Sequence, residues 1–300
     1  MGNAFSSFFR NINPIEREIS RVREKLIEDF DGQKFLVVGR PGCGKSSLIN
    51  SFNYVINLTD PRADYEEIAQ VGASSAGEVS TETVTKSLTK YDFRRKMYVS
   101  LRGDRRKKAP AFFDLVGLPN QAALADLISK LADGKIEDRT NMLAAVSEDD
   151  PSYRENIGKE HRTPQKHMAA WTIIFVLSAK EPFPEGLAND IKEAMGMIEE
   201  LEERSEDLRI FAFITKADKL KDESVRSQKI DDITESFRET LRAPKHRVMK
   251  IINFTDDDDY LDATMKYRPN QQKQLFILRA FSKILSGANC QDPFESLESK

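Results

Sequence analysis

The feature that most constrains this chain is the segment GRPGCGKS, residues 39–46, which fills the pattern G-x-x-x-x-G-K-[ST]. A short apolar run, Phe35–Val38, comes directly before it, and the helix-forming stretch KSSLINSFNYVI overlaps its end and continues beyond it. Glycines let consecutive backbone N–H groups turn toward phosphate oxygens, and a helix that begins there presents its positive end. The sequence therefore predicts a phosphate-binding loop between a strand and a helix.

Within this loop, the residue types predict distinct roles. Lys45 is expected to meet the β- and γ-phosphates of a nucleotide, and the Ser46 hydroxyl is expected to bind Mg²⁺. The loop does not identify the base, because kinases, ATPases and GTPases share it. The predicted nucleotide contacts here are Gly39, Arg40, Pro41, Gly42, Cys43, Gly44, Lys45, Ser46 and Ser47.

Three further apolar runs resemble the run before the loop. They cover Trp171–Leu177, Ile210–Ile214 and Val248–Ile252, and each is short and lacks alternation. Such runs are typical of parallel strands that are covered on both faces. Amphipathic helical stretches lie between them, so we predict an α/β fold with a doubly wound, mostly parallel sheet and helices on both faces.

The domain organisation follows from where this alternation begins and ends. Residues 1–31 are expected to hold an N-terminal segment and an amphipathic helix that starts at Pro14. Residues 32–288 form the predicted nucleotide-binding domain, with a hairpin over 84–114 and a partly helical insertion over 119–170. Residues 289–300 read as a tail. The apolar stripe of the N-terminal helix is Ile15, Ile19, Val22 and Leu26.

Composition excludes several other classes of protein. The 300 residues carry a net charge of only -3, although 32% are charged, so no dedicated nucleic-acid binder is expected. The two cysteines, Cys43 and Cys290, cannot form a disulfide framework, which favours a reducing compartment. No apolar run reaches the ~18 residues that a membrane span requires. We therefore predict a cytoplasmic location.

A second motif, DLVGLPN, starts at Asp114, at the end of an apolar stretch. An acidic residue there can hold Mg²⁺ through water, and the N–H of Gly117 can reach the γ-phosphate. A threonine that senses the same phosphate, and also binds the metal, is expected upstream. We favour Thr85, with Thr83 as the alternative. The predicted metal ligands are thus Ser46, Thr85 and Asp114.

The motif that selects the base is TKAD, residues 215–218, which follows a buried strand. The Asp218 carboxylate can accept hydrogen bonds from N1–H and the exocyclic amine of guanine, and adenine has no such pair of donors. Thr215 and Lys216 complete this motif. The sequence thus predicts that GTP or GDP is the ligand, with Mg²⁺.

The loop that supports the base must follow this motif in the chain. The segment LSAKE, Leu177–Glu181, has a suitable composition, but it precedes the motif and fits better as the end of a strand. We therefore place Asn253 and Phe254, after the last predicted strand, beside the base.

With these motifs in order, the chain resembles the interferon-induced protein 44 and 44-like family of translation-factor-class GTPases. The similarity covers roughly residues 33–287 and includes TVTK, DLVGLPN, WTIIFVLSA, ITKADKL and the insertion segment Asp126–Arg139. The resemblance implies a Ras-like G domain, GTP binding, and a role in innate immune or antiviral responses. The first dozen residues depart from that family.

Turnover is expected to be slow. Small GTPases usually place a glutamine after the D-x-x-G motif, and here the residue is Leu118, which cannot polarise water. The role of that glutamine could be taken by Gln121. Alternatively, a second copy of the chain in a nucleotide-dependent homodimer could supply an arginine, either Arg40 or Arg62. We assign no catalytic residue. The main hypothesis is a slow GTPase switch. The alternatives are a GTP- or GDP-binding scaffold without meaningful hydrolysis and, less well supported, a nucleotide kinase.

The N-terminal residues MGNAFSS match the pattern for myristoylation at Gly2. One acyl chain holds a membrane only marginally, so a second signal is required. The basic turn, residues 94–108, could supply it by meeting anionic lipid. The sequence therefore predicts a peripheral membrane contact through both segments.

Overall fold

The computed structural model describes eleven stretches of the chain. They are residues 14–29, 32–57, 68–69, 89–92, 110–115, 130–131, 134–136, 172–199, 209–243, 247–253 and 271–286.

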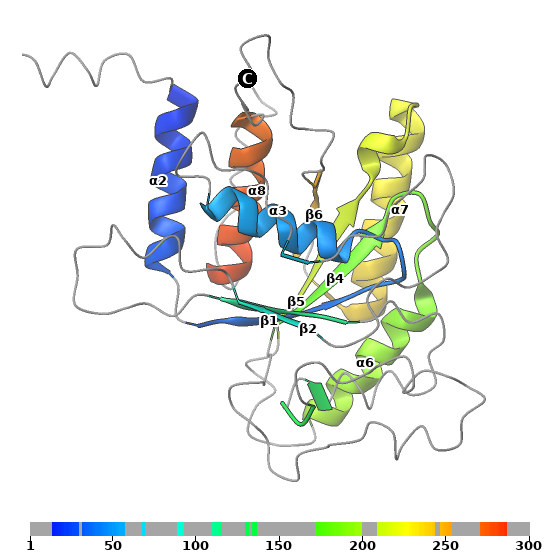
Figure 1. Cartoon of the computed structure of the whole chain (residues 1–300). Helices are drawn as coiled ribbons and strands as arrows, with labels where there is room; N and C mark the ends of the chain where they lie inside the picture. The colour runs from blue at the N-terminus through cyan, green and yellow to red at the C-terminus, as the bar shows by residue number, and fades with distance from the viewer. Residues whose placement is uncertain are drawn as a thin grey trace, which may run out of the picture.

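The centre of the structure is a six-stranded sheet of order β2-β3-β1-β4-β5-β6 (Figure 1). β1, β3, β4, β5 and β6 run parallel, and β2 pairs antiparallel with β3 at one edge. The predicted doubly wound, mostly parallel sheet is confirmed. β2 and β3 form the antiparallel pair expected of the predicted hairpin, whose turn lies outside the described residues. The strands are β1 (Lys34–Val38), β2 (Thr89–Asp92), β3 (Ala111–Asp114), β4 (Thr172–Ser178), β5 (Arg209–Thr215) and β6 (Val248–Lys250).

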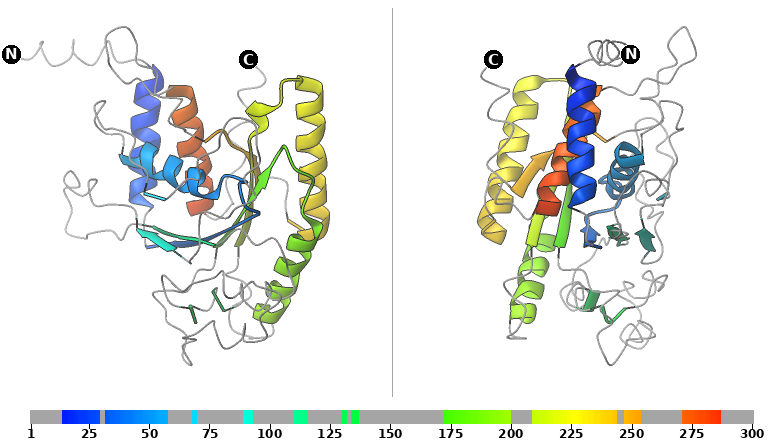
Figure 2. Two further views of the ribbon diagram at one scale, coloured as in Figure 1. Left: turned by 45° about the vertical axis from the view of Figure 1, so that its right-hand side comes forward. Right: turned by 90° about the vertical axis from the view of Figure 1, so that its left-hand side faces the viewer.

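Helices cover both faces of this sheet. One group packs on the face that includes Phe35 and Val37 of β1, and the other packs on the face that includes Leu36 and Val38. The left view of Figure 2 shows α2, α3 and α8 on one side and α6 and α7 on the other. The helices within the described residues are α2 (Pro14–Glu28), α3 (Lys45–Asn57), α6 (Glu185–Glu199), the short 3₁₀ helix η4 (Ala217–Lys219), α7 (Glu223–Leu241) and α8 (Gln271–Ser286).

Aromatic rings fill the core between the sheet and the first group of helices. Phe52 of α3 stacks on Phe281 of α8 with ring centroids 4.7 Å apart, and Phe35 stacks on Phe112 at 4.8 Å. All four side chains are fully buried. Replacing a buried phenylalanine of this kind with alanine costs about 3–5 kcal/mol, so this cluster fixes α3 firmly over the sheet.

The N-terminal helix α2 packs along α8. Its predicted apolar stripe faces inward, with Ile19 and Leu26 buried. Arg23 of α2 is also buried, and its Nε donates a hydrogen bond to the carbonyl oxygen of Val55, 3.1 Å away in the last turn of α3. Burial lowers the pKa of Arg23 to about 10, and the charge of Glu24 acts against this shift. α2 is thereby attached to the end of α3 as well as to α8.

Asn50 of α3 holds a short piece of the connection between α3 and β2. Its Oδ1 accepts hydrogen bonds from the N–H groups of Ile68 (3.0 Å) and Ala69 (2.8 Å), and its Nδ2 donates to the Ala69 carbonyl at 2.8 Å. Asn50 and Ala69 are fully buried. A buried amide with this many partners fixes the backbone at Ile68 and Ala69 firmly against α3.

The structure adjusts some predicted bounds. β6 ends at Lys250, two residues before the predicted strand end, and the first of those residues, Ile251, still donates its N–H to the Ile214 carbonyl. Among the amphipathic helices predicted between the strands, α7 buries residues at helical spacing, namely Ile233, Phe237 and Leu241. Of the predicted, partly helical insertion over 119–170, only residues 130–131 and 134–136 are described, and Lys130 and Leu131 are helical.

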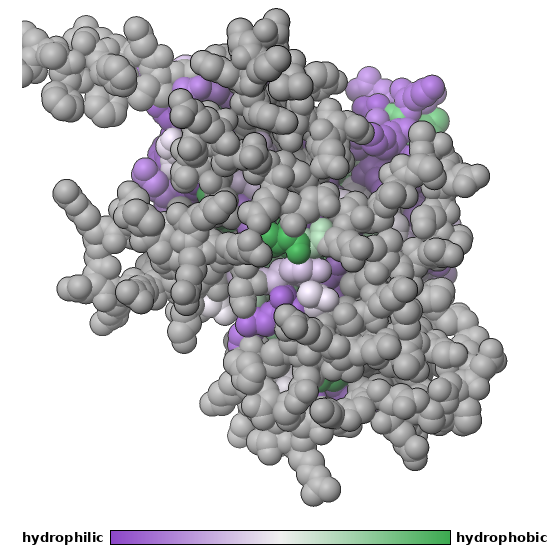
Figure 3. Space-filling model, viewed as in Figure 1, coloured by the Kyte–Doolittle hydropathy of each residue, from purple (hydrophilic) through white to green (hydrophobic). Residues whose placement is uncertain are grey.

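The described part of the surface is mostly hydrophilic in the view of Figure 3, with a small hydrophobic area near its centre. Among the described residues, the exposed large apolar side chains are Val225 and Ile252. None of the described helices combines the length and the apolar character needed to cross a membrane.

Candidate functional site

The predicted phosphate loop connects β1 to α3 at the carboxyl edge of the parallel strands, and α3 begins at Lys45. The loop passes very close to β4. A Cβ atom on Gly39 would lie 2.5 Å from the Val176 carbonyl oxygen and 2.7 Å from Cys43 Sγ. Any side chain at position 39 would therefore push β1 and β4 apart, which explains the first glycine of the motif.

Lys45 folds back over this loop. Its Nζ donates hydrogen bonds to the carbonyl oxygens of Gly39 (3.1 Å) and Arg40 (3.2 Å), and the residue is only 6% exposed. An ammonium group has three donors, so these two bonds fix its position and leave a third donor for a ligand. The first turn of α3 contains no acidic residue. The ammonium group and the open N–H groups of that turn can therefore act together on an anion.

Ser46 and Asp114 meet beside the loop. Because β1 and β3 pair with Val37 opposite Asp114, the end of β3 lies next to the loop. Ser46 Oγ donates a hydrogen bond to Asp114 Oδ2 over 2.8 Å, and Asp114 is completely buried. A hydroxyl and a carboxylate are hard oxygen ligands, which suit Mg²⁺ with water filling its other positions. The pair fits the predicted metal site, and among the described residues no larger cluster of metal-binding side chains competes with it.

The TKAD motif follows β5 and is attached to the phosphate loop through its first residue. Thr215 Oγ1 donates to the carbonyl oxygens of Cys43, 2.5 Å away, and of Leu177, 3.1 Å away. This hydroxyl at the end of β5 therefore contacts both the phosphate loop and β4. The next residue, Lys216, has a left-handed backbone with φ 58°. This turn starts η4, which contains Asp218.

The Asp218 carboxylate is accessible to a ligand. It lies 3.7 Å from Lys219 Nζ, and its side chain is 32% exposed. An exposed ion pair at this distance contributes little, so a base could displace it at low cost. Asp218 can therefore serve as an acceptor for donors on a ligand.

Asn253, which follows β6, reaches the same loop. Its Nδ2 donates a hydrogen bond to the Gly44 carbonyl oxygen at 3.3 Å, and its Oδ1 is buried without a hydrogen-bond partner among the described residues. A Cβ atom on Gly44 would lie 3.3 Å from Asn253 Nδ2 and 3.5 Å from Thr215 Oγ1. The second glycine of the motif thus allows two side chains to approach the loop from outside.

Cys43 is buried inside the loop. Burial raises the pKa of its thiol above the ordinary value, and nearby Lys45 partly opposes this shift. The side chain is thus a neutral packing group beneath the phosphate loop.

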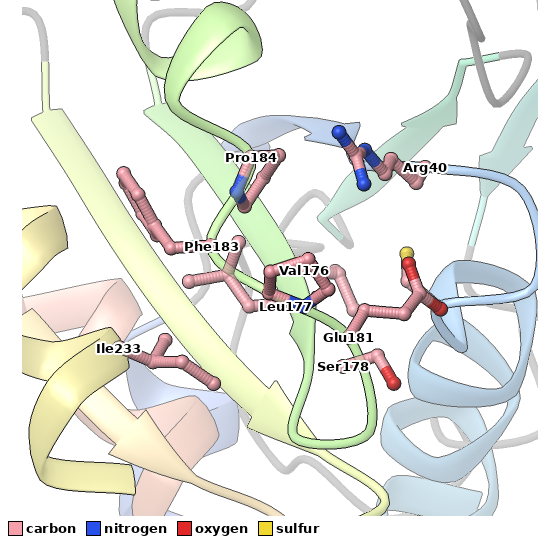
Figure 4. Close-up of a pocket in the computed structure, with 10 residues that line it drawn as sticks. Arg40, Val176, Leu177, Ser178, Glu181, Phe183, Pro184 and Ile233 are labelled. Carbon is pink, nitrogen blue, oxygen red and sulfur yellow. The ribbon is translucent and has the colours of Figure 1, made fainter. Parts of the chain in front are cut away.

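The segment after β4 borders a hollow beside the site. In Figure 4, Leu177, Phe183 and Ile233 form its apolar side, and Arg40 and Glu181 lie toward the phosphate loop. As predicted, LSAKE ends a strand, and Lys180 donates its N–H to Ser178 Oγ within the following turn. Two of the candidate nucleotide contacts, Arg40 and Cys43, belong to the lining of this hollow.

The structure thus brings together Gly39–Ser47, Asp114, Thr215–Asp218 and Asn253, although their roles toward a ligand stay predictions. Thr85, Gly117, Phe254 and Gly2 lie outside the described residues. Leu118, Gln121, Arg62 and the basic turn 94–108 lie outside them too.

Sequence reasoning missed the contacts that join these motifs. It did not predict that Thr215 would bond the Cys43 carbonyl or that Asn253 would bond the Gly44 carbonyl. A usable signal was present, because both are small polar residues that follow parallel strands at the edge where the phosphate loop lies.

A comparison with solved structures finds the chain similar to Toc33 from Arabidopsis thaliana, determined as a dimerization-deficient mutant. The two chains are 14% identical, the match covers 94% of this chain and 96% of that chain, and the TM-score is 0.46. No family model matches the chain. No curated protein matches it either.

Proposed function

We propose that this protein binds guanine nucleotides with Mg²⁺ and hydrolyses GTP slowly, as a switch. The observation that carries this proposal is the hydrogen bond from Thr215 Oγ1 to the Cys43 carbonyl. It joins the predicted base-selecting motif to the predicted phosphate loop, so one ligand with a base and phosphates can reach both. A nucleotide kinase would have no use for that motif.

The phosphate and metal ends of the ligand have matching partners. Lys45 and the first turn of α3 offer positive charge and N–H donors, and Ser46 with Asp114 offers hard oxygens. A bound Mg²⁺ would neutralise the charge that develops on the phosphates. The chain itself would position the β- and γ-phosphates through Lys45 and hold the metal through Ser46 and Asp114.

The base end explains the preference for guanine. Asp218 lies on η4 directly after the turn that Thr215 anchors, and its carboxylate is exposed. Guanine offers two adjacent donors to such a carboxylate, whereas adenine would leave it without them.

The rate of hydrolysis separates the two functional hypotheses. Leu118 after the D-x-x-G motif supports slow turnover, on the order of 10⁻⁴–10⁻³ s⁻¹ without a partner. A scaffold that binds GTP or GDP without turnover is the second candidate. The Ser46–Asp114 pair favours the switch, because a pure scaffold does not require a metal-binding pair of this kind.

The finer assignments stay predictions. They are membership of the interferon-induced protein 44 and 44-like family with its immune or antiviral role, myristoylation at Gly2, membrane contact through residues 94–108, a nucleotide-dependent homodimer, and a cytoplasmic or peripheral membrane location. The resemblance of the motifs supports the first, and the sequence patterns support the others.

Calorimetric titration of the nucleotide-stripped chain with GDP, a GTP analogue and ATP, each with Mg²⁺, tests the proposal. We expect binding of the guanine nucleotides and no heat from ATP. Equal binding of ATP would exclude the preference for guanine, and the absence of any nucleotide binding would contradict the proposed function.

Asp218→Asn sharpens that test. The amide can no longer accept from both guanine donors, so the preference should move from GDP toward xanthosine diphosphate, whose base presents a carbonyl where guanine has its amine. Lys219→Ala serves as the control, because Lys219 only approaches Asp218 and should leave the preference unchanged. An unaltered GDP preference in Asp218→Asn would show that this carboxylate does not read the base.

A further inference from the structure

The phosphate loop is held from outside by side chains that belong to two other strand ends. Thr215, at the end of β5, bonds the carbonyl of Cys43, and Asn253, after β6, bonds the carbonyl of Gly44. These are consecutive carbonyls of the loop. Neither bond involves a side chain of the loop itself, so the contacts act on the backbone alone.

Backbone geometry turns each of these contacts into a constraint on an N–H group. The carbonyl of Gly44 and the N–H of Lys45 belong to one planar trans peptide unit, so they point in opposite directions. A donor that fixes the Gly44 carbonyl on the outside also fixes the direction of the Lys45 N–H on the inside. Thr215 constrains the N–H of Gly44 in the same way.

The Gly44 carbonyl has two partners. Leu48 donates its N–H to this oxygen at 2.9 Å as the first bond of α3, and Asn253 Nδ2 occupies a second direction at 3.3 Å. Together they hold the first peptide of the helix from two sides. That peptide carries one of the N–H groups that a helix leaves without an intrahelical acceptor, and such groups are the ones that bind phosphate.

Asn253 is itself well placed for this role. The N–H of Ile251, two residues earlier, donates to the Ile214 carbonyl at 2.9 Å, which fixes the segment against β5. Its Oδ1 has no hydrogen-bond partner among the described residues, so the bond from Nδ2 sets the orientation of the amide. The close approach requires Gly44, because a Cβ atom there would lie 3.3 Å from Nδ2.

We propose that Asn253 is a positioning residue for the phosphate rather than a contact for the base: by holding the Gly44 carbonyl, it aims the Lys45 N–H at the β-phosphate. This inference rests on the proposed binding of guanine nucleotides. It assigns to Asn253 a role in phosphate affinity, whereas the sequence predicts this residue beside the base.

Two affinity ratios test the inference. The ratio of the dissociation constants of GMP and GDP measures what the β-phosphate contributes, and the ratio for IDP and GDP measures what the exocyclic amine of the base contributes. Both are measured for the full chain by titration calorimetry with Mg²⁺. Any loss of folded protein cancels from each ratio.

The variants are Asn253→Leu, which keeps a similar volume without a donor, and Asn253→Ala. We expect the GMP-to-GDP ratio to fall about three- to tenfold in both, which corresponds to one hydrogen bond, while the IDP-to-GDP ratio stays at the wild-type value. Thr215→Val should act in the same direction and Thr215→Ser should restore the ratio. Ile252→Ala, an exposed neighbour, is the matched control and should change neither ratio.

The outcomes separate the inference from the function on which it rests. An unchanged GMP-to-GDP ratio in the Asn253 variants, or a change in the IDP-to-GDP ratio instead, would overturn the positioning role while leaving nucleotide binding intact. If the wild-type chain binds no guanine nucleotide, the proposed function fails and the inference fails with it.

Discussion

The N-termini of α3 and α7 offer a direct comparison, because each helix follows a parallel strand at the carboxyl edge of the sheet. The N-terminus of α7 is capped by its own N-cap residue: Asp222 Oδ1 accepts hydrogen bonds from the N–H groups of Ser224 (2.9 Å) and Val225 (3.3 Å). α3 has no acidic residue in its first turn and carries Lys45 there instead. One helix start is neutralised internally, and the other keeps its donors for an external anion.

The comparison shows that a helix N-terminus can serve as an anion site when no side chain of its own caps its first N–H groups. The glycines of the loop place no side chain over the N–H groups of α3, and Lys45 adds positive charge. In α7, the capping carboxylate already occupies the position that a phosphate would take. Three variants, taken from the largest expected effect to the smallest, test this contrast.

Lys45→Met should have the largest effect. It removes the ammonium group but keeps a long side chain, so GDP affinity should fall on the order of 100-fold through the loss of charge-assisted hydrogen bonds. Titration calorimetry measures this loss. Lys192→Met, on the exposed side of α6, is the control and should bind GDP like the wild type. Equal affinities of Lys45→Met and the wild type would mean that α3 does not bind the phosphates.

Arg23→Met tests the opposite end of α3, which receives a hydrogen bond from α2. The loss of this bond to the Val55 carbonyl should lower the free energy of unfolding by about 1–3 kcal/mol. Urea denaturation measures the change. Arg21→Met lies on the same helix, and that arginine side chain is 79% exposed, so it should change stability by less than ~0.5 kcal/mol. If both variants are equally stable, the buried bond contributes nothing.

Asp222→Ala should have the smallest effect, because the cap is exposed. It should lower the melting temperature slightly without changing GDP affinity, whereas Asp222→Asn should keep most of the stability, since asparagine also caps helices well. Hydrogen bonds from Ser224 and Val225 lower the pKa of Asp222 below its ordinary value of 3.8.

The lowered pKa gives Asp222 a pH signature. The carboxylate stabilises the folded chain fully above its ordinary pKa, and this contribution is lost as the pH falls through the lower folded-state value. The melting temperatures of wild type and Asp222→Asn should therefore keep a constant difference near neutral pH and change relative to each other only in acid. A changing difference above pH ~6 would assign the pH dependence to another group.

The sequence predicted those parts of the site that depend on local pattern. Gly39–Ser46 could be recognised because strand, glycine turn and helix follow one another within one short segment. The parallel sheet could be predicted because its buried strands read as apolar runs. Asn253 could be placed near the site only by its order in the chain, and the sequence did not indicate that it would bond the Gly44 carbonyl.

The contacts that the sequence did not predict join residues far apart in the chain. Arg23 reads as one more charged residue of an amphipathic helix, and nothing in its spacing indicates that it would be buried against Val55. Asn50 is similar, because its bonds to Ile68 and Ala69 depend on the path of the intervening chain. Hydrophobic period predicts which face of a helix is buried, but it does not predict which polar group on that face finds a partner.

The burial of Cys43 also has a chemical consequence. Oxidants and alkylating reagents react with thiolates, and this sulfur is held as a neutral thiol under a backbone that shields it. We therefore expect the Cys43 thiol to react slowly with oxidants and alkylating reagents while the loop keeps this packing. The packing that places Cys43 beneath the loop would then also limit covalent modification of this sulfur.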